Sequence, residues 1–305
     1  MQRLLARCHF PPPGSTVTCA VSGGADSTAL LALAVASSLD VTAFHVDHGL
    51  REASCTDGEV VATIATRWGA RASSARVVVS EGPNLEARAR EARRGVLPDD
   101  ALYGHTADDL AETVLLRILR GTGPSGLAAM DRATHPLLDL RRAETVALCE
   151  HLGVDPLVDP TNTSPRFTRN RVRREVLPLL DDVAGRDVVP LLCRLADLAG
   201  EDAELIAEAA AELDPTAAEA LSAAPPAVAS AAFRAWWMEC TAMAYPPGRE
   251  AIGRVLRVAS GESRSCDVVG GWRVTRSAGR LTLVPPDPDR SGSTESPGLT
   301  SSDDE

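Results

Sequence analysis

The chain has 305 residues and a formal net charge of −11 at pH 7, which excludes a general basic coat for nucleic acid but not a local basic patch. All 31 basic residues are arginine, and the seven cysteines are scattered without a Cys-x-x-Cys pair. This cysteine pattern argues against a disulfide framework or a metal cluster and indicates reduced thiols in a cytoplasmic protein. Residues 1–10 lack the apolar core of a signal peptide, and no apolar run is long enough to cross a membrane.

The first half of the chain alternates predicted strands and helices. Short β-type apolar runs predict strands, and longer runs with helical spacing predict helices. We expect strands at residues 16–21, 41–46, 76–79 and 101–104, and helices at residues 28–36, 57–68, 84–96, 107–119 and 142–152. This βαβα order predicts an α/β fold with a doubly wound, mainly parallel, Rossmann-like sheet. Such sheets bind ligands beyond the carboxyl ends of their strands.

The pattern changes near residue 187, where alanine-rich helical segments begin and short strands follow. We expect helices at residues 191–213, 225–243 and 249–259, and strands at residues 266–269, 272–275 and 281–284. After residue 285 the composition shifts to Pro, Asp, Ser, Gly and Thr, which is typical of disorder. The sequence therefore predicts a first domain at 1–186, a smaller, mainly helical α+β domain at 187–285, and a disordered tail at 286–305.

A glycine-rich turn, Ser22-Gly23-Gly24-Ala25-Asp26-Ser27, joins the first predicted strand to the first helix. Glycines let the backbone approach an anion closely, and the N–H groups of a first helical turn point at it. The turn lacks the lysine of the Gly-x-x-x-x-Gly-Lys phosphate loop. It resembles the pyrophosphate loop (PP-loop) of ATP pyrophosphatases, which split ATP into AMP and pyrophosphate. The alternative is a plain glycine turn between a strand and a helix.

Acidic residues open the helix that follows the fourth predicted strand. Thr106 is expected to cap this helix. Asp108 and Asp109 follow, four and three residues before Glu112, so all three carboxylates can lie near one face. Three carboxylates at a strand end could hold Mg²⁺ on ATP or bind an ammonium group. The alternative is that the acids only complement the dipole at a helix N-terminus.

Two further polar segments are candidates for nucleotide or phosphate binding. The segment His45–Arg51 ends the second predicted strand, so His48 and Arg51 can reach a nucleotide, although a simple polar loop is the alternative. Residues 166–174 are the densest basic stretch of an acidic chain, which favours a phosphate partner, either ATP or RNA. The alternative for this stretch is a solvated helix N-terminus.

Several of these motifs occur together in the order found in one family. The chain resembles the tRNA(Ile)-lysidine synthases in its glycine loop and in residues 45–51, 84–90, 104–130 and 159–178. The resemblance implies a PP-loop ATP-binding catalytic domain and, more weakly, a tRNA-binding domain at 187–285. It implies that ATP adenylates the wobble cytidine of a CAU-anticodon tRNA(Ile) and that L-lysine then attacks C2 of that base. The products would be lysidine, AMP and pyrophosphate, and a homodimer is compatible with the sequence.

The resemblance also implies roles for individual residues at the ATP. His48 and Arg51 would lie near the nucleotide, and Asp26 would act through Mg²⁺, which makes it both a catalytic and a metal-binding candidate. The loop residues would cradle the pyrophosphate of ATP: Ser22, Gly23, Gly24, Asp26 and Ser27.

A second group of implied roles concerns the lysine and the tRNA. Asp109 and Glu112 would bind the substrate lysine, with Asp108 beside them. Arg169, Asn170 and Arg173 would orient phosphates of ATP or of the tRNA. Among these residues, the catalytic candidates are Asp109, Glu112 and Arg173.

Rival interpretations are distinguished by motifs that this chain has or lacks. A PP-loop tRNA 2-thiolase commonly uses Cys-x-x-Cys pairs, and the chain has none. GMP and NAD synthetases share the glycine loop but not the later motifs. A non-catalytic PP-loop protein that only binds RNA would be expected to lose Asp26, Asp109 or Glu112, and all three are present.

Overall fold

The computed structural model describes residues 1–47, 54–77, 92, 95–157, 167–243 and 245–287, and these form two compact units. The units comprise Met1–Gly200 and Glu201–Glu305. His48, Arg51, most of the helix expected at 84–96 and most of the tail expected at 286–305 lie outside the described residues. Among the helices in the described ranges, none is both long enough and apolar enough to cross a membrane.

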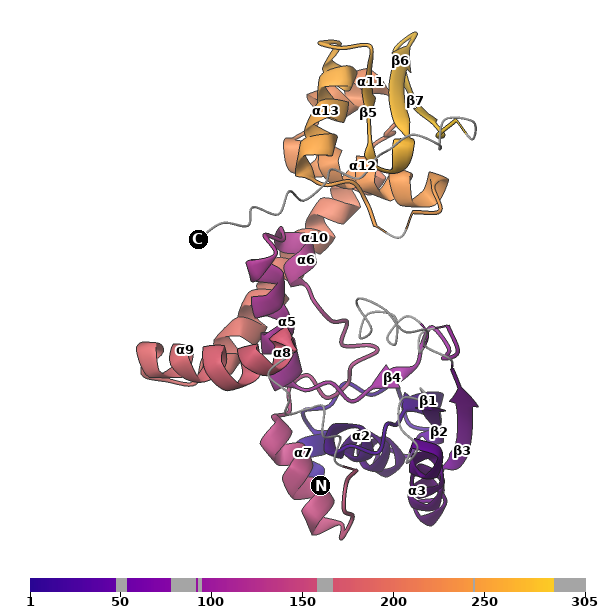
Figure 1. The fold of residues 1–305 in the computed structure, drawn as a ribbon, viewed down its shortest axis with the longest axis vertical. Coiled ribbons are helices and arrows are strands. Elements are labelled where there is room, and N and C mark those ends of the chain that lie inside the picture. Colours follow the sequence, from indigo (N-terminus) through magenta and orange to yellow (C-terminus); the bar gives the residue numbers. More distant parts are fainter. Residues whose placement is uncertain (48–53, 78–91, 93–94, 158–166, 244, 288–305) are drawn as a thin grey trace, which may run out of the picture. The chain divides into compact units, whose positions relative to one another are not determined.

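The first unit is built on a parallel four-stranded sheet (Figure 1). Its strands are β1 (Thr16–Ala20), β2 (Asp40–Asp47), β3 (Arg71–Arg76) and β4 (Leu102–Tyr103), in the order β3-β2-β1-β4. In register, Cys19 of β1 lies between Ala43 of β2 and Leu102 of β4. The parallel sheet confirms the predicted fold class.

The bounds predicted for the third strand, residues 76–79, were wrong, because β3 runs over Arg71–Arg76. Most of its side chains are exposed, so no apolar pattern marks it in the sequence. Backbone pairing with β2 defines this edge strand instead, and Arg71 adds a cross-strand ion pair to Asp40 at 2.7 Å.

Helices pack around this sheet according to their apolar content. Helix α2 (Ala25–Ala36) is buried along most of its length and packs against α7 (Arg142–His151), while α3 (Ser54–Arg67) packs on β2 and β3. An almost wholly apolar helix is stable only inside a core, which explains why α2 lies there. The remaining helices of this unit are α1 (Gln2–Leu5), α5 (Ala107–Leu119), α6 (Pro124–Leu127), α8 (Thr168–Arg171), a π-helical turn (Val172–Val176), α9 (Leu177–Ala184) and α10 (Val189–Ala211), which crosses into the second unit.

The sheet order places a topological switch point at the carboxyl end of β1. Its neighbours are β2 on one side and β4 on the other, so the strand order reverses at β1. Ligands of open α/β sheets bind at such a switch point. The loop from β1 to α2 and the loop from β4 to α5 both begin there, and Gly104 is the residue at which they touch. A Cβ atom on Gly104 would lie 2.6 Å from the carbonyl oxygen of Asp26.

We therefore expect Gly104→Ala to destabilise the protein by about 1–3 kcal/mol, because backbone atoms of the first turn of α2 must move to accept the methyl group. Gly253→Ala is the matched control, since a Cβ there meets no neighbouring atom within 4 Å and alanine favours a helix interior. Thermal melts of both variants test the close approach. Equal melting temperatures would contradict it.

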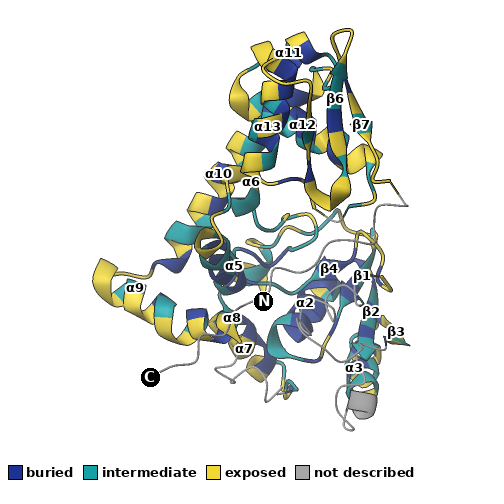
Figure 2. Cartoon of the chain, turned by 45° about the horizontal axis from the view of Figure 1, so that its top comes forward, coloured by how far each residue is buried: buried dark blue, intermediate teal, exposed yellow. Residues whose placement is uncertain are grey.

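In its described residues, the second unit combines the end of α10 and further helices with a small antiparallel sheet. The further helices are α11 (Ala218–Ala223), α12 (Pro226–Cys240) and α13 (Arg249–Ser260). The sheet has the order β5-β6-β7, formed by Ser265–Asp267, Arg273–Ser277 and Arg280–Val284. Phe233 and Trp237 of α12 are buried with Val255 and Val258 of α13. Figure 2 shows buried and exposed residues side by side along these helices. This unit confirms the smaller α+β domain of the predicted fold.

Candidate active site

The glycine loop between β1 and α2 has the geometry of an anion cradle. Gly23 adopts φ +88°, a conformation that favours glycine, and its carbonyl accepts a hydrogen bond from Leu157 N at 2.9 Å. A Cβ on Gly23 would lie 2.4 Å from Leu157 Cδ1. The hydroxyl groups of Ser22 and Ser27 lie 3.1 Å apart, and Ser22 N donates to Ser27 Oγ at 3.2 Å. The loop is thus held in one shape by its own side chains.

Helix α2 begins in this loop without a side-chain cap. Its N-cap is Gly24, whose lack of a side chain leaves the first-turn N–H groups without a side-chain acceptor. These N–H groups and the positive end of the helix dipole suit a phosphate group. Asp26 lies in the same first turn, and its carboxylate accepts a hydrogen bond from the Thr145 hydroxyl of α7.

Helix α5 carries the acidic residues and begins with the predicted cap. The Thr106 N–H group and hydroxyl both donate to Asp109 Oδ2 at 3.0 Å, which confirms Thr106 as the N-cap. Asp109 and Glu112 are both buried, and the side chain of Glu112 is 0% exposed. Burial of two carboxylates requires positive partners nearby.

The central partner is Arg142, the first residue of α7, which the sequence analysis did not single out. Its guanidinium group lies between the two loops: NH2 is 2.6 Å from Asp109, NH1 is 3.2 Å from Glu112, and Nε is 3.4 Å from Asp26. One signal for Arg142 was present in the sequence. A pair of arginines at the start of a predicted helix opposes the helix dipole and therefore needs an acidic partner.

Two arginines of the basic stretch complete the cluster. Arg169 of α8 contacts Glu112 at 2.7 Å, and Arg173 of the π-helical turn contacts it at 2.6 Å. These arginines are four residues apart on one helical segment, so they point to the same acid. Asn170 between them is buried. Two arginines of the basic stretch are therefore joined to the acids of α5, whereas Arg171 and Arg174 are exposed.

Asp108 has different neighbours from the other acids of α5. It accepts hydrogen bonds from Arg141 at 3.0 Å and from the backbone N–H of Arg142 at 2.8 Å. Arg141 in turn contacts Asp187. Asp108 thus fixes the start of α7 and thereby the position of Arg142, while Asp109 and Glu112 contact its guanidinium group.

Opposing electrostatic effects act on the two aspartates that contact Arg142. Burial alone would raise the pKa of Asp109, but Arg142 and Arg169 outweigh it and lower this pKa to about 2. Burial and the charge of Asp109 instead raise the pKa of Asp26, against the opposing hydrogen bond from Thr145 and the charge of Arg142. Asp109 is therefore firmly ionised at neutral pH, whereas the charge of Asp26 is destabilised in the folded chain.

The predicted site residues within the described ranges gather at this switch point, in the glycine loop, at the start of α5 and in the basic segment. Thr145 and Arg142 join them from α7, and the sequence analysis missed both. In the described ranges, no group of three or more His, Cys, Asp or Glu side chains could hold a metal ion by itself. A lone carboxylate beside a phosphate cradle does fit Mg²⁺, which commonly binds through one or two carboxylates plus substrate phosphates.

The fold, the glycine loop and its uncapped helix define a PP-loop protein, and residues 1–180 match the family model described as PP-loop domain. Residues 217–282 match a second model, the TilS substrate binding domain. A tRNA(Ile)-lysidine synthase of Nocardia farcinica is 40% identical over 90% of this chain and 93% of its own length. One of Salinispora tropica is also 40% identical, over 92% of this chain and 94% of its own length.

The chain belongs to the tRNA(Ile)-lysidine synthase family. Among solved structures, a U34-tRNA thiolase from Methanococcus maripaludis is similar with a TM-score of 0.49 and 18% identity, covering 61% of this chain and 73% of that one. This likeness is too distant to bear on the function.

Proposed function

We propose that the protein ligates L-lysine to the wobble cytidine of a CAU-anticodon tRNA(Ile), with ATP converted to AMP and pyrophosphate. In the first step the C2 carbonyl oxygen of the cytidine attacks the α-phosphorus of ATP, and pyrophosphate leaves. In the second step the ε-amine of lysine attacks C2, AMP leaves, and the nitrogen loses a proton. The observation that carries the proposal is the joining of the anion loop to the buried pair Asp109 and Glu112 through one arginine.

The residues of the glycine loop, of the start of α5 and of the basic segment suit these two steps. The α2 N-terminus and the Ser22 and Ser27 hydroxyls would hold the pyrophosphate part of ATP. Asp109 and Glu112 would bind the lysine ammonium, while Arg169 and Arg173 would orient phosphate groups. Donors fixed before the reaction stabilise charge that develops on the transferred groups. His48, Arg51 and Asn170 remain proposed nucleotide or substrate contacts.

Asp26 is the residue proposed to hold Mg²⁺. When bound, the ion would neutralise charge that builds up on the pyrophosphate as it leaves. Asp26 suits this role because its carboxylate lies in the first turn of α2, beside the proposed phosphate cradle, and because burial and the charge of Asp109 raise its pKa, which a bound cation would oppose. We propose the cytoplasm as the compartment, because the substrate is a tRNA and the cysteines in the described ranges are free thiols.

One assay tests the reaction directly. The protein is incubated with ATP, Mg²⁺, labelled lysine and the CAU-anticodon tRNA(Ile), and the tRNA is examined for label and the nucleotides for AMP. Transfer of lysine with release of AMP and pyrophosphate supports the proposal. Release of ADP and phosphate would overturn it, and equal use of ammonia or sulfide in place of lysine would favour a thiolase-like rival.

We propose that residues 1–186 carry the chemistry and residues 187–285 bind the tRNA. The match of residues 217–282 to a substrate binding domain supports this division.

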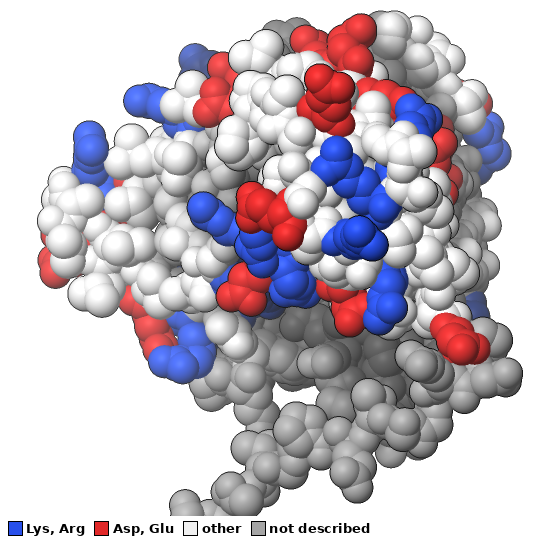
Figure 3. All heavy atoms as spheres, turned by 90° about the horizontal axis from the view of Figure 1, so that it is seen from above, with Lys and Arg blue, Asp and Glu red and all other residues white. Residues whose placement is uncertain are grey.

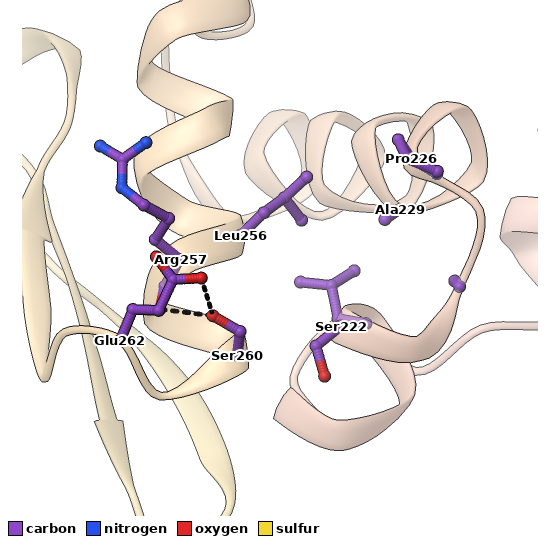
Figure 4. A pocket seen from close by; sticks show the side chains of 9 residues that line it. Ser222, Pro226, Ala229, Leu256, Arg257, Ser260 and Glu262 are labelled. Carbon is purple, nitrogen blue, oxygen red and sulfur yellow. Dashed lines mark hydrogen bonds between the residues drawn. The ribbon is translucent and has the colours of Figure 1, made fainter.

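Arginine side chains gather among acidic ones on the second unit in the view from above (Figure 3). A hollow of about 180 Å³ lies between α11, α12 and α13 (Figure 4). Arg257 extends away from Ser222 on the far side of that hollow.

Four arginines of the second unit differ in their contacts. Arg273 pairs with Asp267 at 2.8 Å, and Arg280 pairs with Asp214 at 2.8 Å. Within the described ranges, Arg257 and Arg264 form no ion pair. Both are exposed, and both lie around the end of α13, where Arg257 O accepts from Glu262 N and Arg264 O accepts from Arg276 N. Arg257 and Arg264 are the proposed phosphate contacts.

Accordingly, we expect the double variant Arg257→Ala/Arg264→Ala to bind tRNA more weakly and to lower the slope of log affinity against log salt by roughly 1–2, because each lost phosphate contact removes about one released counterion. The control is Arg273→Ala/Arg280→Ala, which changes the net charge equally but removes paired arginines. Filter binding at several salt concentrations makes the comparison. Equal slopes for both double variants would refute the assignment.

A further inference from the structure

The carboxylates proposed to bind the substrate lysine are already neutralised by the chain itself. Glu112 and Asp109 each contact Arg142, Arg169 and Arg173. With Asp26 included, three carboxylates face three guanidinium groups. An ammonium group added to this buried, balanced cluster would bring an uncompensated positive charge, which is strongly unfavourable away from water. Lysine binding therefore requires one arginine to leave the acids.

The contacts identify Arg142 as the arginine that can leave. Arg173 holds Glu112 through two nitrogens, with Nε at 2.6 Å and NH2 at 3.1 Å, and its contact to Asp109 is longer, at 3.6 Å. Arg169 adds contacts to the backbone oxygen of Asp109 and to the Thr113 hydroxyl. Arg142 instead divides single contacts among three acids. Paired contacts to one carboxylate are the stronger and more directional arrangement.

Arg142 also has a second place to go. Its Nε lies 3.4 Å from Asp26, in the first turn of the helix whose N-terminus forms the anion cradle. A polyphosphate in that cradle would offer Arg142 several negative oxygens on the side where it already has a contact. Guanidinium groups bind phosphate in the same forked geometry as carboxylate. The nucleotide can thus compete with Asp109 and Glu112 for this one side chain.

We propose that Arg142 is an exchangeable positioning residue: bound ATP draws its guanidinium group onto the polyphosphate, and the lysine ammonium then takes its place on Asp109 and Glu112. This inference rests on the proposed function. It assigns to Arg142 the task of keeping lysine out until ATP is present. Because coupling between two ligands is reciprocal, lysine also binds ATP-loaded protein in preference to free protein and tightens the binding of ATP in turn.

The test measures lysine affinity with and without a nucleotide that cannot react. The full chain is saturated with the CAU-anticodon tRNA(Ile), and labelled lysine is titrated by equilibrium dialysis in the presence or absence of α,β-methylene ATP. The unaltered protein should bind lysine roughly tenfold or more tightly with the nucleotide. Arg142→Met should bind lysine tightly in both conditions, a gain of affinity that a merely structural role would not produce.

Arg171→Met is the matched control, because Arg171 belongs to the same basic stretch but, among the described residues, pairs only with Glu175 on the surface. It should keep the full coupling. Arg142→Gln repeats the test with a side chain that can still donate hydrogen bonds to the acids, in case the methionine variant does not fold. Equal lysine affinity with and without nucleotide in the unaltered protein, or coupling retained in both Arg142 variants, overturns the inference. Failure to bind lysine in any condition, with ATP binding intact, overturns the proposed function itself.

Discussion

Replacing Glu112 with glutamine should abolish most of the activity and also weaken the fold. Glu112 is fully buried and contacts three arginines, so its neutral isostere leaves buried positive charge uncompensated. Removing one partner from a buried charge network costs about 3–5 kcal/mol in general. For a chain of this size that corresponds to a fall of roughly 6–15 °C in melting temperature. We expect kcat/KM for lysine to fall by about a hundredfold or more, since the ammonium loses its deepest acceptor.

The control for this result is Glu175→Gln. Glu175 makes the same type of pair, with Arg171 at 2.9 Å, but both side chains are more than half exposed. Solvent screens such a pair, so neither the melting temperature nor the activity should change measurably. Thermal melts and initial rates at varied lysine concentration separate the two variants. A melting temperature for Glu112→Gln within one degree of the control would mean that the buried cluster contributes no stability.

Asp26→Asn should produce the opposite combination, a loss of activity without a loss of stability. Burial and Asp109 raise the pKa of Asp26 in the folded chain above its unfolded value. A carboxyl group shifted in this direction opposes folding at any pH above both pKa values, and the opposition disappears as the pH falls through the folded pKa. Asparagine removes that charge while keeping a hydrogen-bond acceptor for Thr145. The melting temperature at neutral pH should therefore stay level or rise.

Turnover of Asp26→Asn should still fall, because the proposed Mg²⁺ contact is lost.

Ser27→Ala should lose roughly a hundredfold in turnover, the usual effect of removing one donor from an anion site. Ser37→Ala is its control at the other end of α2, where Ser37 only donates to Leu33 O. The measurement is the initial rate at limiting ATP. Near-normal turnover in either loop variant would show that the glycine loop does not hold the phosphates.

Local sequence patterns predicted the parts of the fold that bury an apolar face. Helix α5 was expected at 107–119 and occupies those residues, because its apolar spacing and its cap at Thr106 agree. The exposed edge strand β3 was misplaced, because its position depends on pairing with β2 and not on its own side chains. The local sequence pattern was therefore enough to place a helix with one buried face. It was not enough to place a strand whose position is set by pairing with a neighbouring strand.

The sequence predicted the acidic residues and the glycine loop of the site, but it did not predict Arg142, which contacts both. Asp109 and Glu112 are neighbours along one helix, so spacing alone brings them together. Arg142 is separated from Glu112 by 30 positions and from Asp26 by 116, and only the folded sheet brings them together. Short-range spacing carries no information about such a contact. The identity of the family came from the order of several motifs, not from this geometry.

The shared dependence of three arginines on Glu112 also limits how this protein can change over generations. A substitution of Glu112 alone leaves the positive charge of the arginines uncompensated, and a substitution of one arginine alone leaves excess negative charge. Each single substitution therefore lowers fitness before a compensating second substitution can arise. The effects of single and double changes will then be far from additive. We expect random mutagenesis under selection for growth to recover changes at the exposed Arg171–Glu175 pair freely, and changes in the buried cluster only as simultaneous pairs.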